Sequence, residues 1–235
     1  MAHKSEGVCR FCLKTFAGSV MTRHLLTCKV KKDRDSQETA NAKKVYPIYH
    51  LKISSSKYYW LYLEMKAASK LSDLDQFLRD IWLECCGHLS SFTIDGVEYQ
   101  DMTYHDDDFS FGEKPKSMEV KLNTVLDIGD KFEYEYDFGT TTYLEGNVLA
   151  AREGELKENV RILARNNPYT FECDECGGQA TDICIECDTL FCEKCLEQHE
   201  CGEEMALPVV NSPRMGLCGY TGDSDPDDFR VAEAK

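Results

Sequence analysis

Apolar and polar residues alternate with a period of two in several stretches in the middle of the chain. This pattern is typical of β-strands that bury one face. In residues 131–139 the alternation is cleanest, and the side chains expected to face the core are Phe132, Tyr134, Tyr136 and Phe138. Further strands are predicted over 45–53, 57–65, 140–153 and 159–167, with a hairpin over 90–100 that turns at Asp95-Gly96.

A period of 3.6 appears in residues 71–86, which we expect to form the main helix. Ser72 is a good N-cap residue, Asp73 favours the helix dipole in the first turn, and Gly87 ends the pattern. The apolar stripe along this helix consists of Leu74, Phe77, Leu78, Ile81, Trp82 and Cys85. We therefore predict a central domain over residues 45–170, built mainly of strands.

The segment that precedes this domain is polar and has no apolar period. Residues 31–44 are therefore expected to be a linker. At the other end, residues 208–235 are expected to be an acidic and partly disordered tail. Asp223, Asp225 and Asp227 imitate the start of a calcium loop, but the glycine and the final glutamate of such a loop are absent, so we reject that site.

Charge is distributed unevenly along the 235 residues. Residues 1–44 carry ten Lys or Arg against four acids, a net charge of +6, whereas the remaining residues carry a net charge of −21. Since phosphate contacts need Lys and Arg, any nucleic-acid contact is expected within the first 44 residues.

The chain has no run of about 18 apolar residues, so we expect no membrane span. Its first residues lack the apolar core of a signal peptide, so we expect a cytoplasmic protein whose thiols stay reduced. Thirteen cysteines in that compartment, most of them in paired CxxC spacing, point to metal rather than to disulfides.

Residues 1–30 have the layout of a C2HC zinc finger. A knuckle formed by Cys9 and Cys12 is followed by His24 and Cys28, which lie one helical turn apart. Phe16 occupies the position where such a finger needs an aromatic core residue.

In DNA-reading fingers the base contacts come from helix positions that correspond here to Ala17, Val20 and Arg23, and only Arg23 is a good base reader. The finger is therefore either an auxiliary nucleic-acid clamp or a small folding and docking unit, and the two interpretations stay open. The residues that would carry the first are Arg23, Lys29, Lys31, Lys32 and Arg34.

The densest chemistry lies in residues 173–201, which hold eight potential zinc ligands. Zinc prefers four thiolate or imidazole ligands, so eight predict two closed sites and bring the total expected to three zinc ions. The ligands are Cys173, Cys176, Cys184, Cys187, Cys192, Cys195, His199 and Cys201.

Two pairings of these eight ligands are possible. A sequential pairing assigns the first four to one zinc, and an interleaved pairing assigns Cys173, Cys176, Cys192 and Cys195 to one site and the other four to the second. We favour interleaving because the spacing resembles the cross-braced B-box module, here over residues 171–207. Whether Cys201 or Cys218 completes the second site stays open.

Residues 46–165 resemble the Ri-plasmid ORF-three family, whose members are often labelled insertion-element passenger proteins or TnpR-like. The motifs that carry the resemblance are HLKI, SDLDQFLRDIW, FTIDGVEY and above all YEYDFG at 134–139. Many members continue DFGD-x-W-x-H, whereas this chain reads DFGTTTYLEG. The resemblance implies an α+β domain with a curved antiparallel sheet. Together with the predicted helix and zinc sites, we expect an α+β fold with a central curved antiparallel sheet and one main helix, flanked by small zinc-binding modules. The resemblance also implies association with mobile genetic elements.

No phosphate-binding loop, nucleophile elbow or metalloprotease motif is present. Cys85 and Cys86 are interpreted as core residues of the helix, and His105 beside Asp106–Asp108 as part of a solvated acidic loop. A cleft near Tyr136, Asp137 and Gly139 is the least favoured site, and it would imply an enzyme.

We therefore predict a non-enzymatic, zinc-binding adaptor with a protein partner. The alternative is a nucleic-acid-binding accessory protein that acts through its basic N-terminal finger.

Overall fold

The computed structural model describes residues 5–101 and 114–222. The acidic loop around His105 and the end of the tail, residues 223–235, lie outside the described residues. The chain forms two compact units, which are described separately: Met1–Asp75 with Leu89–Asn167, and Gln76–His88 with Pro168–Lys235.

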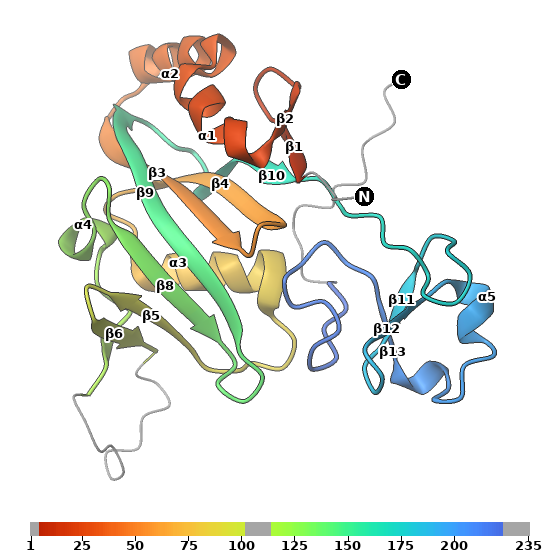
Figure 1. Cartoon of the computed structure of the whole chain (residues 1–235). Coiled ribbons are helices and arrows are strands. Elements are labelled where there is room, and N and C mark those ends of the chain that lie inside the picture. The colour runs from red at the N-terminus through yellow and green to blue at the C-terminus, as the bar shows by residue number, and fades with distance from the viewer. Residues whose placement is uncertain (1–4, 102–113, 223–235) are drawn as a thin grey trace. The chain divides into compact units, whose positions relative to one another are not determined.

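The first unit is built on a ten-stranded sheet with the order β2-β1-β10-β4-β3-β9-β8-β5-β6-β7 (Figure 1). Neighbouring strands are antiparallel except β6 and β7, which are parallel. The strands are β1 (Glu6–Cys9), β2 (Thr15–Ala17), β3 (Tyr46–Ser55), β4 (Tyr59–Lys66), β5 (Ser90–Ile94), β6 (Val97–Gln100), β7 (Lys116–Ser117), β8 (Lys131–Tyr136), β9 (Thr142–Gly154) and β10 (Val160–Asn166).

This fold is α+β, with a mostly antiparallel sheet, as the sequence pattern indicated. The period-two pattern of β8 is realised in its core face, because Phe132, Tyr134 and Tyr136 are buried. Phe138 differs from the expectation and is 45% exposed, since β8 ends at Tyr136 and the chain then turns. The helices are α1 (Gly18–Thr27), α2 (Lys29–Asn41), α3 (Leu71–Leu78) and α4 (Leu122–Val125).

The predicted main helix begins at Leu71, so Ser72 lies inside it and is not its N-cap, and the helix is shorter than the apolar stripe. After α3 the chain continues as a π-helical turn, η1 (Arg79–Leu83). Asp75, in the first half of α3, accepts hydrogen bonds from the hydroxyls of Ser90 (2.6 Å) and Tyr134 (2.7 Å). These buried bonds hold the start of α3 against β5 and β8.

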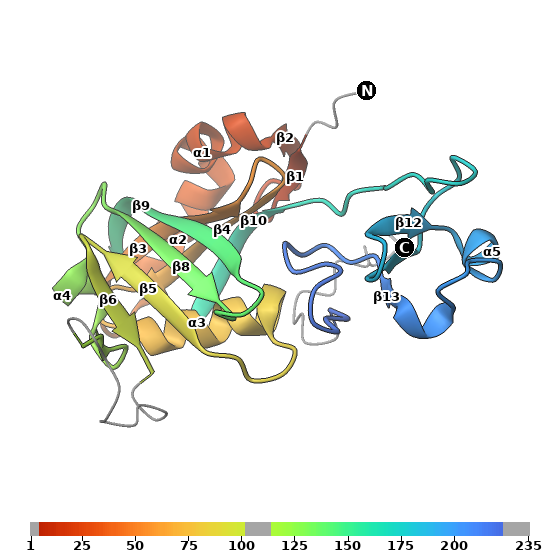
Figure 2. The same cartoon turned by 60° about the horizontal axis from the view of Figure 1, so that its bottom comes forward.

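Residues 29–41, most of which we expected to be a linker, form a helix, α2. Figure 1 shows α1 beside β1 and β10, while α2 lies near the end of β9 (Figures 1 and 2). The expectation failed because this helix has no apolar stripe to detect: its one buried side chain is Lys31. Ion pairs rather than apolar packing therefore attach α2 to the sheet.

The ion pairs centre on Glu64 of β4, which is 1% exposed. Its carboxylate accepts hydrogen bonds from Lys31 Nζ (2.7 Å), Arg152 Nη2 (2.8 Å) and Arg161 Nε (3.1 Å). Burial acts to raise the pKa of Glu64, but the Arg152 hydrogen bond and the nearby cations outweigh it and hold that pKa far below its usual range. Asp35 and Glu38 of α2 complete the network through Arg161.

The N-terminal knuckle is part of the same sheet, since β1 pairs with β10 and Cys9 lies opposite Ala164. The approach is so close that a Cβ on Gly7 would lie 2.0 Å from the Arg165 carbonyl oxygen. The core here joins Met21 and Leu25 of α1 to Trp60 and Tyr62 of β4. The knuckle and α1 thus share their core with the sheet.

The second unit holds a three-stranded antiparallel sheet with β11 (Asp182–Cys184) between β12 (Thr189–Phe191) and β13 (Ala206–Pro208). The unit also contains two short helices, α5 (Glu193–Leu196) and η3 (Glu203–Met205), and the π-helical turn η1. Residues 209–222, expected to belong to the tail, are folded: Ser212, Arg214 and Tyr220 are buried.

Among the described residues, no helix is long and apolar enough to cross a membrane.

We predict that Glu64→Gln lowers the free energy of unfolding by about 3–5 kcal/mol, because it leaves three cations around a neutral side chain in a buried site. Urea unfolding at neutral pH measures this loss. The control is Glu119→Gln, which breaks an ion pair with Lys70 on the exposed surface and is expected to change stability little. Equal effects of the two substitutions would contradict the central role of Glu64.

Candidate metal centres

Every cysteine of the chain lies in one of four groups of Cys and His side chains. In each group the ligand atoms lie within 4.8 Å of one another, so each group could hold a metal ion. The groups are Cys9, Cys12, His24 and Cys28; Cys173, Cys176, Cys192 and Cys195; Cys184, Cys187, His199 and Cys201; and Cys85, Cys86, His88 and Cys218.

The first group is built from the β1–β2 knuckle and from α1. Cys28 lies between α1 and α2, and Cys9 and Cys28 are buried. His24 projects from α1, where its ring stacks on Phe16 with centroids 3.8 Å apart. Its Nε2 lies 3.4 Å from Cys12 Sγ. Phe16, which the sequence predicted to be an aromatic core residue, thus packs against the imidazole of His24.

Burial, and to a lesser extent the charge of Lys14, lowers the pKa of His24, which favours the neutral imidazole that binds metal. Burial also raises the pKa of Cys9 to about 11. For Cys12 burial acts in the same upward direction, but the hydrogen bond from the Lys14 backbone N–H and those from the neighbouring thiols lower its pKa overall.

The second and third groups correspond to the interleaved arrangement of the eight ligands. Cys176 Sγ lies 3.7 Å from Cys192 Sγ, and Cys187 Sγ lies 3.4 Å from His199 Nε2. The two groups cross-brace the unit, because each combines one early CxxC loop with later ligands. Cys201 belongs to the third group, and Cys218 does not.

Three of the CxxC loops have the same type of turn. The residue four places after the first cysteine has a left-handed backbone: φ is 58° at Leu13, 73° at Gly177 and 54° at Asp188. In two of them that residue donates its N–H to the carbonyl of the first cysteine, at 2.8 Å from both Leu13 and Gly177. This turn points both sulfurs of the loop and several backbone N–H groups toward one spot.

These N–H groups favour thiolates. Although burial acts to raise the pKa of Cys173 and Cys184, hydrogen bonds from backbone N–H groups lower both to about 6. Within the same groups, hydrogen bonds with Cys176 and Cys192 raise the pKa of Cys195 to about 12, and burial raises that of Cys201 to about 11. Without a cation, each group can therefore ionise only in part.

The distances agree with a tetrahedral metal site. With Zn–S bonds of about 2.3 Å and Zn–N bonds of about 2.0 Å, the edges of a tetrahedron are about 3.8 Å between sulfurs and about 3.5 Å from sulfur to nitrogen. The observed separations of 3.7 Å and 3.4 Å fit these values. The four-ligand sets leave no position open for water.

The fourth group is not evident from the sequence. Its His88 and Cys218 are separated by 130 residues, yet His88 Nε2 lies 3.1 Å from Cys218 Sγ. The apolar stripe predicts Cys85 and Cys86 as core residues of the helix, but the helix ends before them and Cys86 is exposed. One signal is available in the sequence: three cysteines remain after the other sites are assigned, and His88 follows two of them closely.

The residues proposed to contact nucleic acid fall into two kinds. Arg23, Lys29, Lys32 and Arg34 are exposed. Lys31 corrects the expectation, because it is 6% exposed and its ammonium pairs with Asp35 (2.6 Å) and Glu64, so it cannot face a phosphate.

The residues of the possible enzyme site have a structural role. Asp137 has a φ of 65°, and its Oδ1 accepts hydrogen bonds from the N–H groups of Gly139 (3.0 Å) and Thr140 (3.3 Å). This arrangement is an Asx-type turn after β8.

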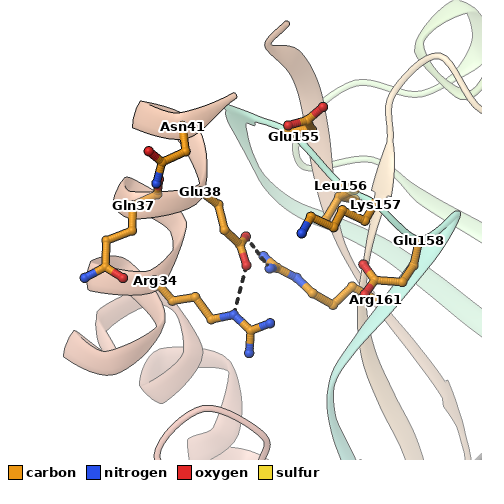
Figure 3. Close-up of a pocket in the computed structure, with 9 residues that line it drawn as sticks. All are labelled: Arg34, Gln37, Glu38, Asn41, Glu155, Leu156, Lys157, Glu158 and Arg161. Carbon is orange, nitrogen blue, oxygen red and sulfur yellow. Dashed lines mark hydrogen bonds and ion pairs between the residues drawn. The ribbon is translucent and has the colours of Figure 1, made fainter. Parts of the chain in front are cut away.

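A hollow of about 650 Å³ lies between α2 and the chain leading into β10, lined by Arg34, Gln37, Glu38, Asn41, Glu155, Leu156, Lys157, Glu158 and Arg161 (Figure 3). Arg34 and Arg161 both point to Glu38, at 2.9 Å and 2.7 Å. Because both arginines are paired with Glu38, we assign no ligand to this hollow.

A smaller cavity of about 190 Å³ is lined in part by His50, Lys31 and Arg152. His50 is 5% exposed, and its Nε2 has no hydrogen-bond partner among the described residues. Burial, with the charges of Lys31 and Arg152, lowers the pKa of His50 to about 4, although Glu64 opposes this. The ring is therefore neutral at physiological pH.

Residues 48–160 match the model of the plasmid pRiA4b ORF-3-like protein family. The match supports the family resemblance of the central stretch. Neither the N-terminal knuckle nor residues 173–201 fall within it.

A solved structure is also similar to this chain: the crystal structure of MM3350, a protein of unknown function from Methanosarcina mazei Go1. It has 15% sequence identity over 56% of this chain and 75% of that chain, with a TM-score of 0.41. Among curated proteins, no significant match was found.

We predict that His50 lowers acid stability. Because its pKa is about 4 in the folded protein and about 6.5 when unfolded, the unfolded state binds the proton first as pH falls. Between pH 7 and pH 4 this histidine should cost about 3 kcal/mol, and His50→Gln should remove that cost. The measurement is urea unfolding of both proteins across this range. A difference between them that does not vary with pH would contradict the assignment.

Proposed function

We propose that the protein is a zinc-stabilised, non-enzymatic adaptor whose C-terminal module binds a basic segment of a partner protein. The observation that carries the first part is the set of closed four-ligand groups. Thiolates and imidazoles in tetrahedral sets are typical of structural zinc, whereas catalytic zinc keeps one position for water or substrate.

Size explains why the C-terminal module would need zinc. Its cluster of buried apolar residues consists of Cys184, Phe191 and Leu196, and each strand of its sheet has three residues. Two of the three strands end at or next to a ligand of the second or third group. A core this small does not offset the entropy of ordering the chain, so metal binding would supply the folding energy.

Charge indicates what the module would bind. Residues 171–207 contain eleven acids and one Lys, and all the acids except Asp182 are exposed. Two zinc ions and seven thiolates would add a further formal charge of −3. The exposed apolar side chains of Ile185 (45%) and Met205 (38%) lie among these acids, and the Ile185 N–H donates to the Met205 carbonyl.

This surface repels a phosphate backbone and attracts Lys and Arg. Apolar side chains surrounded by charge are typical of protein-docking surfaces. Binding of a basic protein segment is therefore favoured over nucleic-acid binding for this module. Association with mobile genetic elements is part of the proposal only through the plasmid protein that gives the matched family its description.

For the metal we predict that Cys192→Ser unfolds the C-terminal module, residues 171–207, and lowers the zinc count, because structural zinc supplies about 10–16 kcal/mol of folding free energy in small fingers. Native mass spectrometry of the full chain counts the zinc, and limited proteolysis reports the unfolding. Thr181→Ser, a neighbouring conservative change outside the ligand groups, should keep every zinc. An unchanged zinc count in the Cys192 variant would contradict closed structural sites.

For the partner we predict that a double charge reversal in the module, Glu203→Lys with Glu204→Lys, reduces partner capture by about tenfold, because like charges then face the basic segment. The measurement is affinity capture from an extract of the source organism, with and without nuclease, quantified by mass spectrometry. The matched control, Glu98→Lys with Glu145→Lys, makes the same charge change on exposed residues of the first unit.

Capture lost in the module variant and kept in the control supports the adaptor. Equal capture by both variants would overturn the acidic docking surface. Capture that disappears on nuclease treatment would transfer the function to the nucleic-acid accessory, which acts through Arg23 and its basic neighbours.

A further inference from the structure

We propose that Cys85, Cys86, His88 and Cys218 form a fourth zinc site, which fastens the C-terminal segment 209–222 to residues 76–88. All four ligands belong to the second unit. The choice of zinc as the metal rests on the proposed function, whereas the site itself rests on its own geometry. The sequence suggested Cys218 only as an alternative to Cys201, and it did not connect Cys218 with Cys85, Cys86 or His88.

The first half of the site is a rigid loop. Arg79 donates to Glu84 Oε2 (2.9 Å) and to the carbonyl of His88 (2.7 Å), so that it spans the loop from one end to the other. Glu84 Oε1 in turn accepts the N–H of Gly87 at 2.6 Å. Gly87 has a φ of 71°, which reverses the chain between Cys86 and His88. Arg79 and Glu84 therefore hold three potential ligands in one tight turn.

The second half is brought in by the C-terminal segment. The hydroxyl of buried Ser212 donates to the Trp82 carbonyl at 2.5 Å and accepts the N–H of Arg214 at 2.9 Å. Two further turns follow, with Leu217 N–H donating to Arg214 and Tyr220 N–H to Leu217. The segment is thus anchored to the end of η1 next to the loop.

Cys218 has the backbone expected of a residue placed by such an anchor. Its φ is 49°, a left-handed conformation that is uncommon for a residue with a side chain, and Gly219 beside it has a φ of 70°. This conformation places Cys218 Sγ at 3.1 Å from His88 Nε2. Strain that persists at one cysteine, directly opposite a histidine and two other thiols, indicates a function for that side chain.

A bound metal gives a role to all four side chains of the group. A buried cysteine pair does not fit, because Cys86 and Cys218 are exposed. A disulfide between any two of the thiols would not account for the third thiol, whose sulfur lies in the same group. Three thiolates and one neutral imidazole match the donor preference of zinc.

The site differs from the other three groups in accessibility, since none of its ligands is buried. Its role would be to close the second unit. Residues 76–88 and 209–222 are distant in sequence and contribute no strand to the three-stranded sheet. The metal would link these two segments, as backbone hydrogen bonds link the strands of the sheet.

The test is a zinc count on the full chain by native mass spectrometry, combined with alkylation of cysteines by iodoacetamide and peptide mapping. We expect four zinc ions in the wild type and three in Cys218→Ser and in His88→Gln. His50→Gln replaces a buried histidine that belongs to no ligand group, so it is the matched control and should keep four.

Peptide mapping then locates the lost ion. In Cys218→Ser the remaining ligands Cys85 and Cys86 should become alkylated, while the ten cysteines of the other groups stay protected. This pattern distinguishes loss of the site from general unfolding. Cys192→Ser should give the opposite pattern, with alkylation inside residues 173–201, so failure of the proposed function is separable from failure of this site.

Three ions in the wild type, with Cys85, Cys86 and Cys218 freely alkylated, would overturn the site. A chain mass lower by two hydrogens, with a disulfide mapped among these three cysteines, would overturn it as well. An unchanged count of four in both Cys218→Ser and His88→Gln would show that these residues hold no metal.

Discussion

Close packing of thiols is the constraint on which much of this structure depends. Thirteen cysteines gather in four groups, and in each group the ligand atoms lie within 4.8 Å of one another. The backbone N–H groups around Cys173 and Cys184 already favour thiolates, yet their partners Cys195 and Cys201 are pushed toward the neutral form. Full ionisation of a group needs a cation at its centre. This need is greatest in residues 171–207, whose cluster of buried apolar side chains consists only of Cys184, Phe191 and Leu196.

In the first unit, a buried negative charge is neutralised by cationic side chains of the protein. Glu64 is a buried carboxylate that three cations surround, and two of those cations reach across from α2 and from β10. The ring of Phe11, from the first CxxC loop, lies under Lys31 (5.7 Å) and Arg161 (5.4 Å). The first ligand group and the ion network are therefore neighbours on one surface of the sheet. Metal at the first would help to position the second.

The two ends of the chain differ in which charged side chains they expose. Near the N-terminus, part of the basic charge is buried in ion pairs, as at Lys31. The acids of the C-terminal module, by contrast, are exposed except for Asp182. The proposed docking of a basic partner segment rests on this exposed acidic surface. In the central domain, the carboxylate of Asp137 accepts the N–H of Gly139 in a turn that follows β8.

The sequence by itself determined the elements whose signal is local. Alternation predicted β8 and its buried aromatic face, periodicity predicted the start of α3, and CxxC spacing collected ten cysteines into three candidate groups that the structure also brings together. Tertiary structure alone decided three other features. Helix α2 is held by ion pairs to strands far along the chain, so it has no apolar period. The knuckle joins the sheet through β10, which lies more than 150 residues away in sequence. The fourth group forms only when a turn at Cys218 meets a loop 130 residues earlier. Periodicity and motif spacing report only on contacts between residues that are close in sequence. The three features above depend on contacts between residues that are far apart in sequence, which only the fold brings together.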